Sequence, residues 1–446
     1  MADGNKQSPV TSDRRRFLKV TGSAAAVTAG AGCLGSITGG SGGGGGGGTT
    51  IEYLSDRGGS KEYFEQIASD FEDENSDITV EMEYTSKGTS MLERLSQRIA
   101  GGNPPDIVFG PSVDAYRFAV DGNAVPVTDV NDELGIDSPT VHEGEEYISP
   151  LMRQVWTYWY RNDLYDANPG TFDEWQAQAK AAESADGDTR GFLALNGETN
   201  IGSTSGFQLV WSAGAQIFGG ESGNIEVVLD QGENREKVAN ALSWYGQMHE
   251  YSPDAIDWGW GDSYNALAQE SVAAAPGLGS DPALTVQNNN DEIADKVSGS
   301  LAPRADGTEP PIFQYVQGHI IHGESESPEA AKEFVKYFHE SEHYFDWLVS
   351  SPMYLLPFNK DQMDHEAFTE NEFISNHMDM WNLYKDNWDR FQLLEDTSDG
   401  EEPNLVAANA YNEQVLGWML SQAVVRDEDP ATVVDETAER LRQLQE

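Results

Sequence analysis

Cysteine and basic residues are both scarce in this chain. Cys33 is the only cysteine among 446 residues, so no disulfide can form within the chain and packing alone must hold the fold. Lysine and arginine number 27 against 76 acidic residues, which gives a formal net charge of −49. Such an acidic surface repels nucleic acid and anionic lipid, so a nucleic-acid partner is not expected.

Catalytic signatures are scarce as well. The sequence contains no phosphate-binding P-loop, its Gly-x-Ser-x-Gly match at 39–43 lies within the glycine-rich run, and its His-Glu-x-x-His match is the segment 339–343. His319 with His322, and His339 with His343, have the spacing of metal ligands, but with so many acids available this spacing has low specificity. We therefore expect structural or surface histidines, no metal, no cofactor and no enzyme activity.

Aromatic residues, in contrast, are plentiful. The chain holds 11 Trp, 17 Tyr and 17 Phe, and hydrophobic residues make up 38% of it. This composition is typical of a folded protein of about two large domains. The excess of acid resembles the proteins of salt-loving archaea, in which carboxylates keep the surface hydrated at high salt. An acidic pair in this chain is therefore uninformative about function.

The N-terminal residues have the features of a targeting signal. Arg14, Arg15, Arg16 and Lys19 precede a weakly apolar Ala/Gly run, the pattern of a cleavable export signal over residues 1–32. The run is too short and too poor in Leu and Ile to span a bilayer. Its basic start resembles the twin-arginine signal, although Asp13 stands where that signal prefers Ser or Thr.

Cys33 follows the signal and resembles the lipidated cysteine of a lipoprotein, although Gly30 departs from the usual Leu. A nearly pure glycine run follows, so residues 33–50 are expected to form a flexible tether. Together these features predict a chain that works outside the cytoplasm, anchored to the outer face of the cytoplasmic membrane through Cys33.

Strands and helices alternate after the tether. Short apolar strands are expected at 51–54, 78–84 and 107–109. We expect Ser60 to cap the first intervening helix, and the second to bury Met91, Leu92, Leu95 and Ile99. This order is typical of an α/β sheet.

A second α/β region is expected from residue 151 onward. Residues 155–160 read as an aromatic strand, and Thr171 to Glu174 form a capping box that opens a helix. Further helices are expected at 235–251 and 264–271, and after Ser327 and Asp429.

Several fragments carry a family resemblance in their order and spacing: Ala100–Val108, Trp159–Tyr165, Pro169–Trp175, Trp211–Phe218 and Ser327–Phe334. They resemble segments of extracellular solute-binding proteins of the sugar-binding type that serve ABC importers. The resemblance covers roughly residues 51 to 440.

The resemblance implies a two-lobe, periplasmic-binding-protein-like α/β fold with a hinge and an interlobe cleft. We expect lobe 1 at 51–150 plus 302–340, and lobe 2 at 151–301 plus 341–446. It further implies a monomer that captures a small solute, a sugar or oligosaccharide, and delivers it to membrane permease subunits powered by a cytoplasmic ATPase.

Sugars present apolar faces and hydroxyl rims, so a sugar site needs aromatic platforms and a few polar groups. Asp56 and Arg57 follow the first strand, at the carboxyl end where open sheets bind ligands. The other candidates are aromatic or lie in the Gly-loosened loop 257–264. The expected ligand-binding residues are Asp56, Arg57, Trp156, Tyr158, Trp211, Trp258, Trp260, Asp262, Tyr264 and Tyr354.

Each candidate has an alternative reading as turn, strand-core or helix-packing residue. Asp281 and Pro282 replace a Trp that the family often carries, which weakens assignment to maltose-like oligosaccharides. Two other functions stay open. One is a secreted glycoside-acting enzyme with paired carboxylates across a cleft. The other is the same scaffold binding a glycerol phosphate ester, a polyamine or a metal complex.

Overall fold

The computed structural model describes residues 48–85, 91–185, 187–397, 400 and 402–445. The predicted export signal, Cys33 and most of the glycine-rich tether lie outside these residues. Among the residues described, no helix is both long and apolar enough to cross a bilayer.

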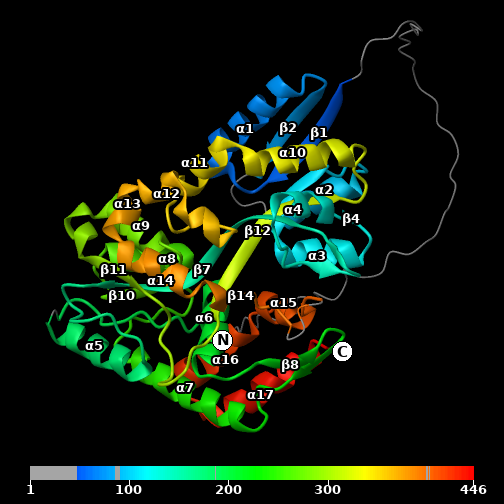
Figure 1. The fold of residues 1–446 in the computed structure, drawn as a ribbon. Coiled ribbons are helices and arrows are strands. Elements are labelled where there is room, and N and C mark those ends of the chain that lie inside the picture. Colours follow the sequence, from blue (N-terminus) through cyan, green and yellow to red (C-terminus); the bar gives the residue numbers. More distant parts are fainter. Residues whose placement is uncertain (1–47, 86–90, 186, 398–399, 401, 446) are drawn as a thin grey trace, which may run out of the picture. The chain divides into compact units, whose positions relative to one another are not determined.

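The first part of the fold follows the predicted alternation of strand and helix (Figure 1). β1 lies between β2 and β3 and is parallel to both, which confirms the predicted α/β arrangement. Each intervening helix returns the chain to the same edge, so the carboxyl ends of all three strands face one way. The elements are β1 (Thr49–Ser55), α1 (Lys61–Glu74), β2 (Ile78–Tyr84), α2 (Met91–Ala100) and β3 (Ile107–Pro111).

Two local predictions in this region are wrong. Ser60 makes no side-chain cap to α1, because its hydroxyl accepts a hydrogen bond from the Trp347 indole at 2.9 Å instead. On α2 only Leu95 is buried, whereas Leu92 and Ile99 are 48% and 40% exposed. Helical periodicity identified the apolar face of α2 but not how much of that face the sheet covers.

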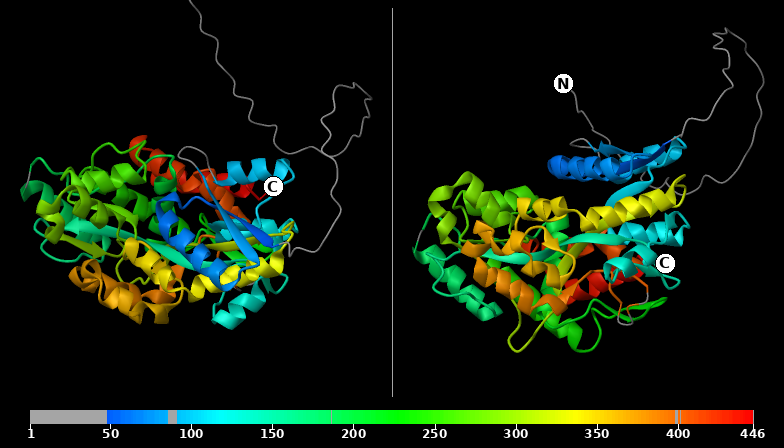
Figure 2. Two further views of the ribbon diagram at one scale, coloured as in Figure 1. Left: turned by 90° about the horizontal axis from the view of Figure 1, so that it is seen from above. Right: turned by 45° about the horizontal axis from the view of Figure 1, so that its top comes forward.

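Two long strands join this part to the rest of the chain. β7 (Ser149–Arg161) and β12 (Ile312–His322) pair antiparallel, and β12 also pairs antiparallel with β3. The order of the main sheet is therefore β10-β7-β12-β3-β1-β2. Figure 1 and the right view of Figure 2 place the blue β1–α1–β2 segment at the opposite end from the C-terminal helix α17 (Pro430–Gln443).

The remaining elements cover the two ends of this sheet. Between β3 and β7 lie α3 (Ser112–Val120), β4 (Ala124–Val125), α4 (Thr128–Leu134), β5 (Val141–His142) and β6 (Glu145–Glu146). Between β7 and β12 lie α5 (Phe172–Ala185), α6 (Asn200–Ser212), β8 (Phe218–Glu221), β9 (Asn224–Val227), α7 (Glu233–His249), α8 (Trp260–Ala268), β10 (Ala274–Leu278), α9 (Asp281–Asn289) and β11 (Val297–Ser300).

After β12 the chain is mostly helical. Its elements are α10 (Pro328–Glu340), α11 (Glu342–Ser350), β13 (Leu356–Pro357), α12 (Glu366–Thr369), α13 (Glu372–Asn376), α14 (Met378–Asp386), β14 (Phe391–Gln392), α15 (Leu405–Asn412) and α16 (Val415–Leu420), followed by α17.

The predicted capping box at the start of α5 is confirmed. The Glu174 carboxylate accepts the Thr171 backbone N–H at 2.9 Å, and the Thr171 hydroxyl accepts the Glu174 N–H at 3.4 Å. The helices expected after Ser327 and Asp429 begin at Pro328 and Pro430, where proline fits the first helical position.

Candidate functional site

Arg57 lies in the turn that follows the carboxyl end of β1. Its backbone N–H donates to the Ser55 hydroxyl at 3.0 Å, and its guanidinium donates to the Gln317 amide oxygen on β12. Its Nε lies 3.7 Å from the Asp56 carboxylate, and the guanidinium lies 5.5 Å from the centre of the Phe109 ring. The short turn and strand β12 thus hold Arg57 in a defined, mostly buried position.

Tyr354 approaches Arg57 from the segment before β13. Its hydroxyl lies close to Arg57 and to Gln154 of β7. Burial raises the pKa of Tyr354, and the nearby Asp281 carboxyl adds to that rise. Gly279 makes this approach possible, because at φ +51° a Cβ there would lie 2.4 Å from the Met353 carbonyl oxygen and 2.7 Å from the Tyr354 Cα.

Asp281 begins helix α9 at the same place. Burial raises the pKa of its carboxyl to about 7, while the charge of Arg57 opposes that rise. Asp281 also lines a pocket of about 430 Å³ between α9, residues 350–352 and residues 371–373. The carboxyl is therefore reachable from solvent through this pocket.

Aromatic side chains continue the site along β7 and α8. The Trp156 and Trp260 rings meet edge to face at 5.9 Å, and Trp260 lies 6.4 Å from Tyr264. Burial raises the pKa of the Tyr264 hydroxyl, and the nearby Asp281 and Tyr354 add to that rise, which places the Tyr264 ring beside them. We refer to this group as the Arg57–Tyr354 cluster; its members are Asp56, Arg57, Gln154, Trp156, Trp260, Tyr264, Asp281, Gln317 and Tyr354.

Three buried donors of the Arg57–Tyr354 cluster make no hydrogen bond of good geometry with the residues that the structure describes. They are Arg57 Nε, Gln154 Nε2 and Trp156 Nε1. Gln154 and Trp156 are 2% and 0% exposed and project from the same face of β7, because they are two residues apart on a strand. An unmade hydrogen bond of this kind costs about 1–3 kcal/mol. A bound ligand with oxygen acceptors would satisfy these donors and recover that free energy.

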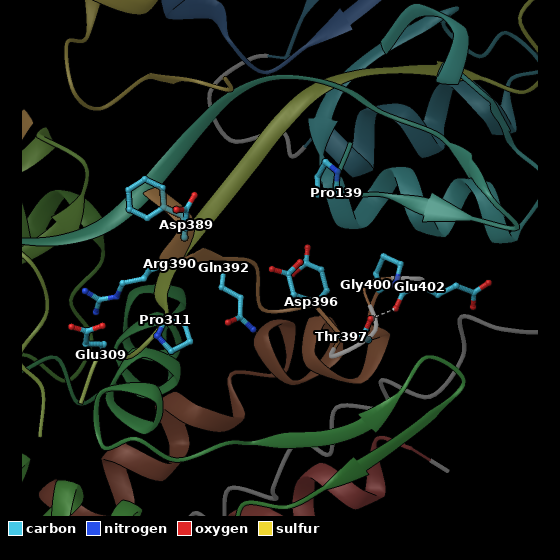
Figure 3. A pocket seen from close by; sticks show the side chains of 13 residues that line it. Pro139, Glu309, Pro311, Asp389, Arg390, Gln392, Asp396, Thr397, Gly400 and Glu402 are labelled. Atoms are coloured by element: carbon cyan, nitrogen blue, oxygen red, sulfur yellow. Dashed lines mark hydrogen bonds between the residues drawn. The ribbon is translucent and has the colours of Figure 1, made fainter. Parts of the chain in front are cut away.

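A larger hollow lies elsewhere, at the start of β12. Two adjoining pockets of about 600 Å³ and 450 Å³ share a wall formed by Glu309, Pro311, Gln392, Asp396 and Thr397. Figure 3 shows Glu309 and Arg390 at one end of the first pocket and Glu402 at the other. We call these two pockets together the Glu395 groove. The carboxylates that line it are Glu309, Asp389, Glu395, Asp396 and Glu402.

Partners within the protein surround the acids of the Glu395 groove. Ser112 donates to Glu395 at 3.3 Å, Tyr116 donates to Glu402 at 3.3 Å, and the Leu393 N–H donates to Asp396 at 2.8 Å. Burial, helped by the neighbouring Asp396, raises the pKa of Glu395 to about 7, and burial raises that of Asp396 to about 6. The protein itself donates hydrogen bonds to these three carboxyl groups, so they do not indicate a ligand site.

The predicted ligand residues divide between several places. Six of them meet in the Arg57–Tyr354 cluster: Asp56, Arg57, Trp156, Trp260, Tyr264 and Tyr354. The other four have further partners, although the Tyr158 ring also meets the Trp156 ring edge to face at 6.1 Å. Tyr158 stacks on Phe192 at 5.6 Å in the core, and Trp211 is buried along the Glu395 groove.

Trp258 packs partly buried against the core, and Asp262 caps α8 by accepting the Gly259 N–H at 2.9 Å. Gln154, Gln317 and Asp281 of the cluster were not among the predicted ligand residues. The one sequence signal concerned Asp281, which stands with Pro282 where the family often carries a Trp.

The histidines have local partners. His319 Nε2 lies 2.9 Å from the Tyr53 hydroxyl, and His339 Nε2 lies 2.9 Å from the Ser149 hydroxyl. Burial lowers the pKa of both imidazoles. In the part of the chain that the structure describes, no three His, Cys, Asp or Glu side chains are grouped as a metal site would require.

Comparison with known proteins gives a consistent result. The sequence model of a family described as bacterial extracellular solute-binding protein matches residues 55–343. Proteins of Brucella abortus and Brucella suis that are named as binding proteins are 27% identical over 186 residues. This match spans 38% of the chain and 43% of the length of those relatives.

Solved structures resemble the whole fold. The GacH receptor of Streptomyces glaucescens matches with a TM-score of 0.70 at 16% identity, covering 89% of this chain and 98% of GacH. Maltose-bound MalE3 of T. maritima matches at 0.70 and 20% identity, covering 89% and 100%. UgpB of Mycobacterium tuberculosis, in complex with glycerophosphocholine, matches at 0.68 and 14%, covering 90% and 99%. The predicted two-lobe α/β fold is thereby confirmed.

Proposed function

Because this chain belongs to the family of bacterial extracellular solute-binding proteins, we propose that it captures a small sugar or oligosaccharide and delivers it to an ABC import permease. The observation that carries the proposal is the set of three buried donors in the Arg57–Tyr354 cluster that make no good hydrogen bond within the described part of the chain and that lie among aromatic rings. A sugar brings many oxygen atoms and an apolar face, and so matches both features.

Similar structures support the sugar class. GacH is described in complex with acarbose, MalE3 with maltose, and a sugar transporter from Arthrobacter chlorophenolicus with laminaribiose. The cluster holds donors in Arg57 and Gln154 and acceptors in Asp56 and Asp281. A hydroxyl group both donates and accepts, so a neutral sugar fits this mixture.

The mechanism we propose is closure of two lobes around the solute. With lobe 1 at 51–150 plus 302–340 and lobe 2 at 151–301 plus 341–446, Arg57 belongs to one lobe and Tyr354 and Asp281 to the other. Strands β7 and β12 carry the chain between them. A solute that touches both sides stabilises the closed arrangement over the open one, and no covalent bond is made or broken.

The place of action we propose is the outer face of the cytoplasmic membrane. Residues 1–32 serve as a twin-arginine export signal, and a lipid on Cys33 anchors a monomeric, halophilic protein by the tether that ends near residue 50. Replacing Cys33 by Ser is expected to move the protein from the membrane fraction to the medium. A Cys33→Ser protein that stays on the membrane would contradict the lipid anchor.

A glycerol phosphate ester is a second candidate solute. UgpB, which shares the fold, is described with glycerophosphocholine, and the Arg57 guanidinium is a suitable phosphate donor. Against this candidate, the cluster contains two carboxyls, Asp56 and Asp281, and one guanidinium. The phosphate of glycerophosphocholine, a singly charged diester, would face net repulsion there.

A thermal-shift measurement in high salt tests the proposal. The protein is heated with maltose, laminaribiose, acarbose or glycerophosphocholine, because a ligand that binds only the folded state raises its stability. At a concentration about 100 times Kd the gain is about 2.7 kcal/mol. We expect a rise in Tm with at least one sugar. A rise with glycerophosphocholine alone, or hydrolysis of a sugar by the purified protein, would overturn the sugar-binding function.

A further inference from the structure

The Asp281 carboxyl stands out because it accepts no hydrogen bond within the described ranges. Among the residues that the structure describes, no backbone N–H and no side chain is hydrogen-bonded to this carboxylate. Yet Asp281 lies against the Arg57–Tyr354 cluster and lines the pocket of about 430 Å³. A carboxylate in such a position is normally paired, because burying an unpaired charge is costly.

The charged and titratable groups around Asp281 do not compensate it. The charge of Arg57 acts on Asp281, but the Arg57 guanidinium lies beside Asp56 and donates to Gln317. From α8 and from the segment before β13, Tyr264 and Tyr354 face Asp281 as neutral hydroxyls, since burial raises the pKa of both. From α13, the exposed Glu372 lines the same pocket and adds negative charge. The cluster therefore holds two carboxyls for one guanidinium.

Two groups can neutralise such a carboxyl: a proton or a bound cation. That burial raises the pKa of Asp281 to about 7 shows how poorly the protein alone stabilises the charged form. Aromatic rings also lie at the site, and an ammonium group is attracted to aromatic faces. A ligand carrying one ammonium group would supply the missing positive charge and donate hydrogen bonds to Asp281.

We propose that Asp281 is a specificity-determining residue that selects a solute carrying an ammonium group, such as an amino sugar, over the neutral sugar of the same size. This inference rests on the proposed function and narrows its substrate class. The sugar oxygens satisfy Arg57, Gln154 and Trp156, and the ammonium group pairs with Asp281.

Proton linkage follows from this assignment. Below about pH 7 the Asp281 carboxyl is protonated, so an ammonium group must displace that proton in order to bind. The affinity for an amino sugar therefore weakens as the pH falls below 7, by up to about tenfold per pH unit. The affinity for a neutral sugar does not need this deprotonation and lacks the same fall.

Calorimetric titration of glucosamine and glucose at pH 7 tests the inference. The full chain is compared with Asp281→Asn and with Glu372→Gln, an acid-to-amide control on the same pocket. We expect glucosamine to bind the parent at least tenfold more tightly than glucose. Asp281→Asn loses this preference and keeps its affinity for glucose within about threefold, whereas Glu372→Gln keeps the preference.

The outcomes are distinct. Equal binding of both sugars by the parent, or a preference that survives Asp281→Asn, overturns the inference and leaves sugar binding in place. No binding of glucosamine, glucose or the sugars of the thermal-shift measurement counts against both. The Tm of Asp281→Asn is measured alongside, and Asp281→Ser, which also lacks the charge, repeats the comparison if the Asn variant does not fold.

Discussion

The Arg57–Tyr354 cluster and the Glu395 groove differ in how their polar groups are satisfied. The groove is the larger hollow, but Glu395, Asp396 and Glu402 accept hydrogen bonds from Ser112, the Leu393 N–H and Tyr116. The cluster adjoins a smaller pocket and contains three buried donors that make no good hydrogen bond in the part of the chain that the structure describes. Unmet hydrogen-bonding capacity is therefore a better guide to a binding site than the volume of a cavity.

Replacing an arginine in each region tests this difference most strongly. Arg57→Gln removes a charged donor from the cluster, and hydrogen bonds to charged groups are worth about 1.5–3 kcal/mol. We therefore expect the Kd for the sugar identified by thermal shift to rise about 10–100-fold. Arg390→Gln, the matched change in the groove, is expected to alter Kd by less than about threefold. Calorimetry with both folded variants measures the two effects.

A reversed ranking would break the comparison: if Arg390→Gln weakened binding more than Arg57→Gln, the groove would be the solute site. Arg390 donates to the Pro310 carbonyl oxygen, so its variant is expected to lose some stability. Binding is therefore measured well below the Tm of each variant.

The same comparison can be made with two glutamines, for which a smaller effect on binding is expected. Gln154 Nε2 makes no good hydrogen bond to any described residue, so Gln154→Leu should leave stability unchanged or raised while weakening sugar binding by about 3–10-fold. Gln208 on α6 accepts the Phe313 N–H at 2.8 Å and donates to the Pro311 carbonyl oxygen at 3.0 Å. Gln208→Leu should therefore lose about 1–3 kcal/mol of stability. Urea unfolding and calorimetry on both variants give the two numbers.

If Gln154→Leu destabilised the protein as much as Gln208→Leu, the Gln154 amide would have a structural partner. The proposal that this amide donates a hydrogen bond to the bound sugar would then be contradicted.

The smallest expected effect concerns the pH dependence of stability in the groove. Glu395 has a folded-state pKa of about 7, above its ordinary value. Such a group contributes stability below the unfolded pKa, and this contribution is lost as the pH rises toward 7. Between pH 4 and 7 the Tm of the parent should therefore fall by about 1–3 °C more than that of Glu395→Gln. Thermal unfolding followed by circular dichroism at several pH values measures the difference, and parallel curves would contradict it.

The fold was largely predictable from local pattern. Apolar strands and amphipathic helices alternate from β1 to β3, and the capping box at Thr171 marks a helix start by short-range chemistry alone. Ser60 was misjudged because a distant indole, that of Trp347, takes its hydroxyl. Leu92 and Ile99 were misjudged because periodicity does not report how far a sheet extends beneath a helix.

The site was predictable only in part, for the same reason. Asp56 and Arg57 follow the end of β1, a position that chain order alone indicates. Gln154 and Gln317 reach the cluster through the pairing of β7 with β12, and Asp281 reaches it through a turn packed against residues 353 and 354. Such long-range contacts leave no periodic trace, and the abundance of acid hides any single carboxylate.

The carbonyl oxygen of Gly279 has a consequence for affinity. It accepts hydrogen bonds from the Thr157 hydroxyl at 2.6 Å and from the Trp159 indole at 2.7 Å, so the turn that leads into α9 is fastened to β7, which also bears Gln154 and Trp156. The donors of Gln154 and Trp156 and the Asp281 carboxyl are thus held in fixed relative positions before a solute binds. Little conformational entropy remains to be lost on association, and tight capture then requires few contacts.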